Sequence, residues 1–169
     1  MADQLDALVR AINQSQFRQH RRLEAALTRI DTTLSEWDAM LAIRQRPGAL
    51  EKELAISTSQ TEQSFRHLAS HLVGRDMITR RSGPGSNIEH QLTDAGERKL
   101  IEATPLLREA QSELFASLNL SDRRDLQRIL KLLLADQHET FGGSLSSYDY
   151  ESRFGDPSDR EVNSRAQRA

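Results

Sequence analysis

The stretch TEQSFRHLASHLVGRDMITRRSGPGSNIEHQLTDAGERKL, residues 61–100, decides the fold of this chain. In its first part, apolar residues recur every three or four positions, as on one face of a helix. Alternating residues then flank a turn at Gly83-Pro84-Gly85, which is the pattern of a β-hairpin. Thr93 is placed to cap a further helix. The expected elements are a helix with Thr61 as N-cap, strands at 77–81 and 88–92, and a helix from 93 to about 117.

The segments before this stretch are expected to form three helices. The first, at 4–30 with Asp3 as N-cap, would be roughly 40 Å long at about 1.5 Å per residue. A helix of that length cannot bury its whole apolar stripe in so small a domain, so a partner chain is the simplest cover. The second helix begins with a capping box formed by Ser35 and Asp38 and ends at a Pro-Gly pair. The third is short and covers 49–57.

The C-terminal part divides into a helix and a polar tail. A helix is expected from Leu120, because its leucines and isoleucines fall on one stripe. Residues 138–169 are polar and rich in glycine and serine, so they are predicted to be mostly disordered. The predicted order is four helices, two strands and two helices, which gives a mainly α fold.

Composition narrows the function classes. The chain has no cysteine, so disulfides and Cys-type zinc sites are excluded. It has no long apolar run and no signal-peptide pattern, so a cytoplasmic protein without a membrane partner is expected. Its net charge of −2 by itself argues against a nucleic-acid partner. Between Gln63 and Ile88, however, the sequence has four arginines and only one acidic residue, so positive charge is concentrated around the hairpin.

Two short helices joined by a turn and followed by a hairpin make a winged helix-turn-helix. A helix fits the major groove of duplex DNA, where its outer side chains can read base edges. The hairpin can straddle the backbone beside it, and arginines at its base can hold phosphates. The sequence therefore predicts double-stranded DNA as a partner.

Residues 30–137 resemble the multiple-antibiotic-resistance regulator (MarR) family of bacterial transcription factors. TLSEWDAMLAI, at 33–43, is similar to the family's second helix, and ELA, at 53–55, to its third. The stretch from 61 to 81 follows the recognition helix and first wing strand without a gap. LTDAGERKL, after the wing, and NLSDRRDLQRILKLL, before the tail, match the start of the last two helices.

The resemblance implies a homodimeric regulator, most simply a repressor that occupies a pseudo-palindromic promoter site. The first and last two helices of each chain would interlock, and a small aromatic or anionic effector could release the dimer from DNA. The implied division is a dimerisation helix at 1–33, a winged DNA-binding domain at 34–92, dimerisation helices at 93–137 and the tail at 138–169.

The resemblance also suggests the residues that meet DNA, against the alternative of an ordinary solvated surface. The wing departs from the family, because its tip reads SGPGSN and lacks the arginine that usually enters the minor groove. Arg80 and Arg81 lie on opposite faces of their strand, with structural ion pairing as the alternative. The candidate DNA-binding residues are Thr61, Gln63, Ser64, Arg66, His67, Arg80, Arg81 and Asn87.

An effector site near the dimer seam would use Phe17, His20 and Trp37, although Trp37 also suits the core and His20 a solvated basic surface. His67 and His71 have metal-ligand spacing, but nothing nearby completes such a site, so no metal is expected. No nucleophile–base pair or phosphate loop is present, so neither an enzyme nor a cofactor is predicted. The alternative function is a winged-helix protein–protein interaction module without sequence-specific DNA binding.

Overall fold

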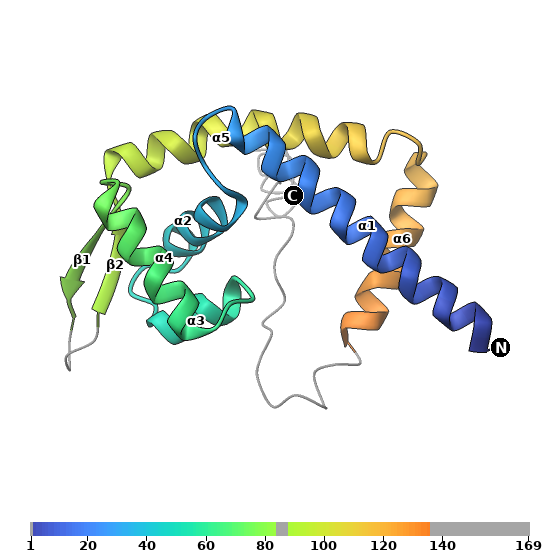
Figure 1. The fold of residues 1–169 in the computed structure, drawn as a ribbon, viewed down its shortest axis with the longest axis horizontal. Coiled ribbons are helices and arrows are strands. Elements are labelled where there is room, and N and C mark those ends of the chain that lie inside the picture. The colour runs from blue at the N-terminus through green and yellow to red at the C-terminus, as the bar shows by residue number, and fades with distance from the viewer. Residues whose placement is uncertain (1, 84–87, 136–169) are drawn as a thin grey trace, which may run out of the picture.

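A computed structural model describes residues 2–83 and 88–135, which form six helices and one two-stranded sheet (Figure 1). The elements are α1 (Ala2–Thr28), α2 (Leu34–Gln45), α3 (Glu51–Ser57), α4 (Glu62–Gly74), β1 (Ile78–Ser82), β2 (Ile88–Leu92), α5 (Asp94–Leu114) and α6 (Leu120–Ala135). The predicted element order and the mainly helical winged-helix class are confirmed. The predicted DNA contact Asn87 and the tail at 138–169 lie outside the described residues.

Several predicted element bounds were wrong by a few residues. Helix α1 already includes Ala2, so Asp3 lies in its first turn and is not its N-cap as predicted. Helix α3 begins at Glu51 rather than at 49, and strand β1 ends at Ser82 rather than at 81. Helix α1 ends at Thr28 rather than at 30, because the chain turns through Asp31, whose φ is +51°. Strand β1 starts at Ile78 rather than at 77, because the Met77 N–H donates to the Leu72 carbonyl and closes a turn. Helix α5 ends at Leu114, three residues before the predicted end at 117.

Helix α2 begins at a different cap from the predicted one. Its N-cap is Thr33, whose hydroxyl accepts from the Glu36 N–H at 3.1 Å, while the Glu36 carboxylate accepts from the Thr33 N–H at 2.8 Å. The prediction of Ser35 with Asp38 was therefore wrong. Two cap patterns overlap here, and the glutamate at the third helical position completes the reciprocal box. The caps predicted at Thr61 and Thr93 are confirmed, since each hydroxyl accepts from the N–H three residues on.

The core lies between α2, α4, the hairpin and the first half of α5. Phe65 and Leu72 on the inner face of α4, Met40 on α2 and Ile78 on β1 are almost completely buried. Each such side chain stabilises the fold by about 1.5–3 kcal/mol through burial. This core fixes α4 with one face inward, so its opposite face is the one presented to solvent.

The hairpin is antiparallel, with Ile78 opposite Leu92 and Arg80 opposite His90. Side chains alternate between the two faces of a strand, so Ile78, Arg80 and His90 share the face toward α4. Arg81 and its partner Glu89 take the other face. The expectation that Arg80 and Arg81 lie on opposite faces is therefore confirmed.

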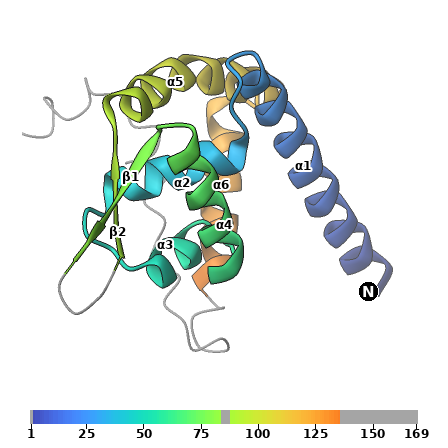
Figure 2. The same ribbon diagram turned by 60° about the vertical axis from the view of Figure 1, so that its left-hand side comes forward.

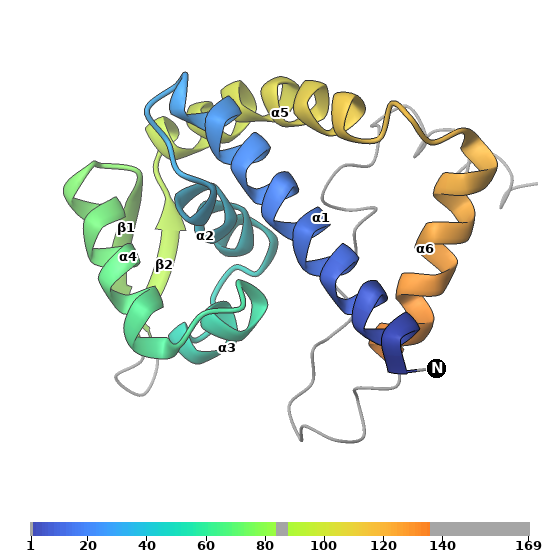
Figure 3. The same cartoon turned by 45° about the vertical axis from the view of Figure 1, so that its right-hand side comes forward.

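Helices α1 and α6 extend away from α3 and α4 (Figure 3), and both expose large apolar side chains. The C-terminal half of α1 packs on α5, and Leu23 and Leu27 in this half are buried. The N-terminal half of α1 exposes large apolar side chains, and no residue of α6 is buried. The exposed set on these two helices includes Leu5, Leu8, Val9, Ile12, Leu126, Ile129, Leu130 and Leu133. No helix among the described residues is long and apolar enough to cross a membrane.

Candidate nucleic-acid interface and adjoining pocket

The outer face of α4 presents the predicted recognition residues together. The buried positions Phe65, Ala69 and Leu72 hold the inner face, and the hairpin stands beside the helix (Figure 2). The exposed residues on the outer side include Thr61, Gln63, Ser64, Arg66 and His67. The Thr61 hydroxyl donates to Ser64 Oγ at 2.8 Å, so these two hydroxyls are already hydrogen-bonded to each other. Gln63 and His67 are exposed and lie one helical turn apart on the same side of α4.

Arg66 is exposed but held by two acids. Its Nε donates to Glu51 at the start of α3 at 3.0 Å, and its Nη2 donates to Glu62 at 2.7 Å. The hydrogen bond and charge of Glu51 raise the pKa of Arg66. Arg66 was predicted as a DNA contact, and its restraint by two carboxylates was not predicted from the sequence.

Glu51 is itself hydrogen-bonded to a buried histidine of the wing, His90. His90 Nε2 lies 3.1 Å from Glu51 Oε1, and its ring meets the edge of Phe65 at 5.9 Å between centroids. Burial lowers the pKa of His90, although Glu51 opposes the shift. We therefore assign the neutral ring, with Nε2–H donating to Glu51. Burial alone would raise the pKa of Glu51, but hydrogen bonds from Arg66 and His90 lower it below the ordinary value.

Neither Glu51 nor His90 was among the predicted site residues. One sequence signal was available, because His90 occupies an inward position of a strand that otherwise alternates Ile88 and Leu92. A polar side chain at such a position needs a buried partner. The partner, Glu51, is 39 residues away in the sequence and could not be identified from spacing.

The neutral state of His90 predicts a pH-dependent stability. Because its folded pKa lies below the ordinary 6.5, the unfolded chain binds one more proton as the pH falls below that value. The free energy of unfolding should be fully retained above about pH 6.5 and fall below it, with a slope of at most about 1.4 kcal/mol per pH unit. Urea unfolding at several pH values measures this.

The matched variant is His90→Gln, whose amide can still donate to Glu51 but does not titrate. The difference in unfolding free energy between the wild type and this variant should change over that pH range. A constant difference would show that the folded protein protonates His90 as readily as the unfolded chain does.

A second ion-pair network ties the end of α4 to the turn before α2. Arg75 donates to Glu36 at 2.8 Å and to Asp31 at 2.7 Å, and His71 Nε2 lies 3.1 Å from Glu36. Burial would raise the pKa of Glu36, but the Thr33 N–H, Arg75 and His71 together lower it. His71 therefore has a structural neighbour, and no group of metal-ligating side chains is found in the described ranges.

The two wing arginines differ in their surroundings. Arg80 Nη2 donates to Ser70 Oγ at 2.8 Å and to the Arg66 carbonyl at 3.3 Å, so it braces the hairpin against α4. The alternative prediction, that Arg80 forms a structural ion pair, was wrong, because both of its acceptors are uncharged. Arg81 is exposed on the other face, opposite Glu89. Arg81 is thus the better placed of the two for a phosphate beside the wing.

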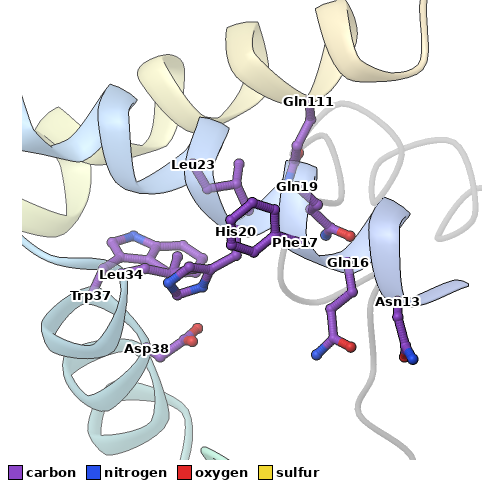
Figure 4. Close-up of a pocket in the computed structure, with 10 residues that line it drawn as sticks. All are labelled: Asn13, Gln16, Phe17, Gln19, His20, Leu23, Leu34, Trp37, Asp38 and Gln111. Atoms are coloured by element: carbon purple, nitrogen blue, oxygen red, sulfur yellow. The ribbon is translucent and has the colours of Figure 1, made fainter. Parts of the chain in front are cut away.

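A cavity of about 680 Å³ lies between α1 and the start of α2 (Figure 4). It brings together Phe17 and His20 from α1 with Trp37 from α2, the three residues predicted for an effector. Trp37 is also buried, as the core alternative expected. Arg21 stands 5.7 Å from the centre of the Phe17 ring and adds a cation near the cavity. Asp38 is an acidic lining residue that works against an anion.

Comparison with known proteins gives relatives in one class. No protein-family model matches the chain. The HTH-type transcriptional repressor Rv2887 of Mycobacterium tuberculosis is 27% identical over 116 residues, 68% of this chain and 84% of the repressor.

Solved structures share the fold. A mutant of MarR from E. coli complexed with operator DNA has a TM-score of 0.73 at 20% identity, covering 79% of this chain and 98% of that one. Rv2887 of M. tuberculosis, described as a MarR family protein, complexed with p-aminosalicylic acid has a TM-score of 0.62 at 24% identity. It covers 75% of this chain and 97% of that one.

Proposed function

We propose that this chain, a winged-helix protein of the MarR family, is a homodimeric transcription regulator that represses by occupying promoter DNA. The observation that carries the proposal is the outer face of α4, which presents an amide, hydroxyls and a guanidinium beside the wing. Each of these groups can hydrogen-bond a base edge or a phosphate. The E. coli relative complexed with operator DNA supports the same use of the fold.

The dimer is proposed because α1 and α6 expose apolar stripes with matching spacing. Leu5, Leu8, Val9 and Ile12 on α1 follow the same three-and-four spacing as Leu126, Ile129, Leu130 and Leu133 on α6. Contiguous apolar surface of this kind marks a protein interface. A two-fold dimer would place its two α4 helices on half-sites about one helical turn apart, which requires a pseudo-palindromic site.

Gln63 and Arg81 are expected to contribute to DNA binding in different ways. An amide can pair bidentately with adenine, so Gln63→Ala should weaken binding to the cognate site about tenfold while leaving binding to scrambled DNA unchanged. Arg81→Ala should weaken both equally and make the logarithmic salt slope shallower by about one phosphate contact. Fluorescence anisotropy on both DNAs across a salt series measures this. Equal effects of the two variants on both DNAs would contradict the assignment.

The cavity between α1 and α2 is proposed to take a small aromatic acid. Phe17 and Trp37 supply the apolar walls, and His20 can donate to a carboxylate. The relative complexed with p-aminosalicylic acid supports this class of ligand. A ligand that binds one spacing of the two α4 helices more tightly than the other would shift the population away from DNA.

Benzoate binding tests the pocket, because Trp37 is the only tryptophan and reports on it by fluorescence. His20→Ala should weaken benzoate binding about tenfold, as expected for a lost hydrogen bond to a charged group. His67→Ala is the matched control, since it removes an exposed histidine outside the cavity. A saturable response that is the same in both variants would place the ligand elsewhere.

A further inference from the structure

The guanidinium of Arg66 is oriented before any DNA arrives. Glu51 holds Nε at 3.0 Å and Glu62 holds Nη2 at 2.7 Å. Among the described residues no hydrogen bond is made by Nη1. An arginine carries further N–H donors on both terminal nitrogens, and these are the groups that form the bidentate pair with guanine O6 and N7. The two acids therefore occupy one edge of the guanidinium and leave its outer end open.

Glu51 is the fixed point of this arrangement. Its side chain is only 10% exposed, whereas that of Glu62 is 50% exposed. One carboxylate oxygen accepts a hydrogen bond from His90 of β2, and the other accepts one from Arg66 of α4. Glu51 thereby joins three elements, α3, α4 and the wing, at a single carboxylate. A side chain anchored in this way has little rotational freedom to lose when its partner binds DNA.

The charges around Arg66 favour base reading over phosphate binding. A free arginine near DNA is drawn to the nearest phosphates, which give affinity without sequence information. Here two carboxylates neutralise the cation and would repel the phosphate backbone. With its charge neutralised, Arg66 can still donate directional hydrogen bonds from the outer end of its guanidinium.

We propose that Glu51 is a specificity-determining positioning residue, which holds Arg66 in the orientation that reads a guanine of the half-site. His90 braces Glu51 from the wing side. The proposal rests on the DNA-binding function proposed above. It adds that one residue of α4, Arg66, recognises a G·C base pair. Glu51 itself does not touch DNA.

Glu51→Gln separates this role from a structural one. The glutamine carbonyl can still accept from His90, but its amide group and the Arg66 N–H are both donors, so the link to Arg66 is lost. Glu62→Gln is the matched control, because it removes the same charge beside the same arginine and leaves the Glu51–Arg66 contact. The control should strengthen binding to all DNAs slightly and keep the base preference.

The experiment is a competition assay with the full-length protein and a site in which each base pair is substituted in turn. Arg66→Ala identifies the base pair that depends on Arg66, which should be G·C. Glu51→Gln should lower the preference at that same base pair by at least about fivefold. In the Arg66→Ala background, Glu51→Gln should have no further effect, which a double-mutant cycle detects. Glu51→Asp, which keeps the charge on a shorter side chain, should give an intermediate loss.

Two results would overturn the proposal. One is a Glu51→Gln substitution that lowers the affinity for all DNA sequences equally, or that lowers the base preference by the same factor with and without Arg66. The other is a Glu51→Asp protein that keeps the full preference when Glu51→Gln is too unstable to assay. A wild-type protein with no base preference at any position would instead refute the DNA-binding function itself, and the inference with it.

Discussion

Replacing Leu130 by aspartate is expected to convert the proposed dimer into monomers and to abolish the proposed tight DNA binding. Leu130 lies on the exposed apolar stripe of α6, and a charge there would have to be buried without a partner. A monomer engages one half-site at a time, so affinity for the full site should fall by about a hundredfold or more. Analytical ultracentrifugation and anisotropy on the cognate site measure the two effects.

Leu132→Asp provides the control for this change. Leu132 lies on the same helix and is 62% exposed, but it is two positions away from Leu130 and therefore points to a different side of the helix. The same aspartate at this position should leave the dimer intact. If both variants remain dimeric, or both become monomeric, the assigned interface on α6 is wrong.

Gly96→Ala is expected to destabilise the fold strongly. A Cβ at this position would lie 2.2 Å from the Met77 carbonyl oxygen, which is backbone and also accepts from the Thr93 N–H at 3.1 Å. The start of α5 and the residue that precedes β1, Met77, must therefore move apart. Overpacking of this kind costs about 3 kcal/mol, a large part of the stability of a typical domain. Urea unfolding measures the change in the free energy of unfolding.

Gly74→Ala is the matched substitution at an open position. Gly74 is the last residue of α4, and a Cβ there would meet nothing within 4 Å. Alanine should stabilise the helix by up to about 1 kcal/mol, because it restricts the unfolded chain more than glycine does. Equal stability of the two variants would mean that α5 does not approach the wing as closely as described.

Much of the fold could be predicted because its signals are local. The caps at Thr61 and Thr93, the alternation in the hairpin and the helical spacing of Phe65, Leu68 and Leu72 each depend on neighbours a few residues away. Where two local signals overlapped, at Thr33 and Ser35, the prediction chose the wrong cap. Both patterns satisfy the spacing rule, and the folded chain uses the one with the longer acidic side chain.

The site was predictable only in part, because its restraints connect residues far apart in the chain. The exposed face of α4 follows from the buried face, which periodicity predicts. The contacts of Arg66 with Glu51 and of Glu51 with His90 depend on how α3 and β2 approach α4, and no sequence spacing encodes them. Glu62 accepts a hydrogen bond from Arg66 at 2.7 Å, one helical turn along the same helix.

The net charge of the chain, −2, opposes nucleic-acid binding only if the charge is spread evenly. Arg80 and Arg81 lie at the wing beside α4, whereas acids such as Glu109 and Glu113 pair with Arg29 and Arg22 on the far helices. Positive charge on the proposed DNA-binding surface is therefore carried by the two wing arginines, because Glu51 and Glu62 neutralise Arg66.

The most direct test of the central claim is fluorescence anisotropy of the full-length protein on the intergenic DNA upstream of its own gene. A scrambled duplex serves as the control, and both are titrated across a salt series. The proposed function predicts tight binding to the upstream DNA alone, with affinity that falls steeply as salt rises because phosphate contacts release counterions. Equally weak binding to both duplexes at low salt would contradict it, and would favour a winged-helix module that binds another protein.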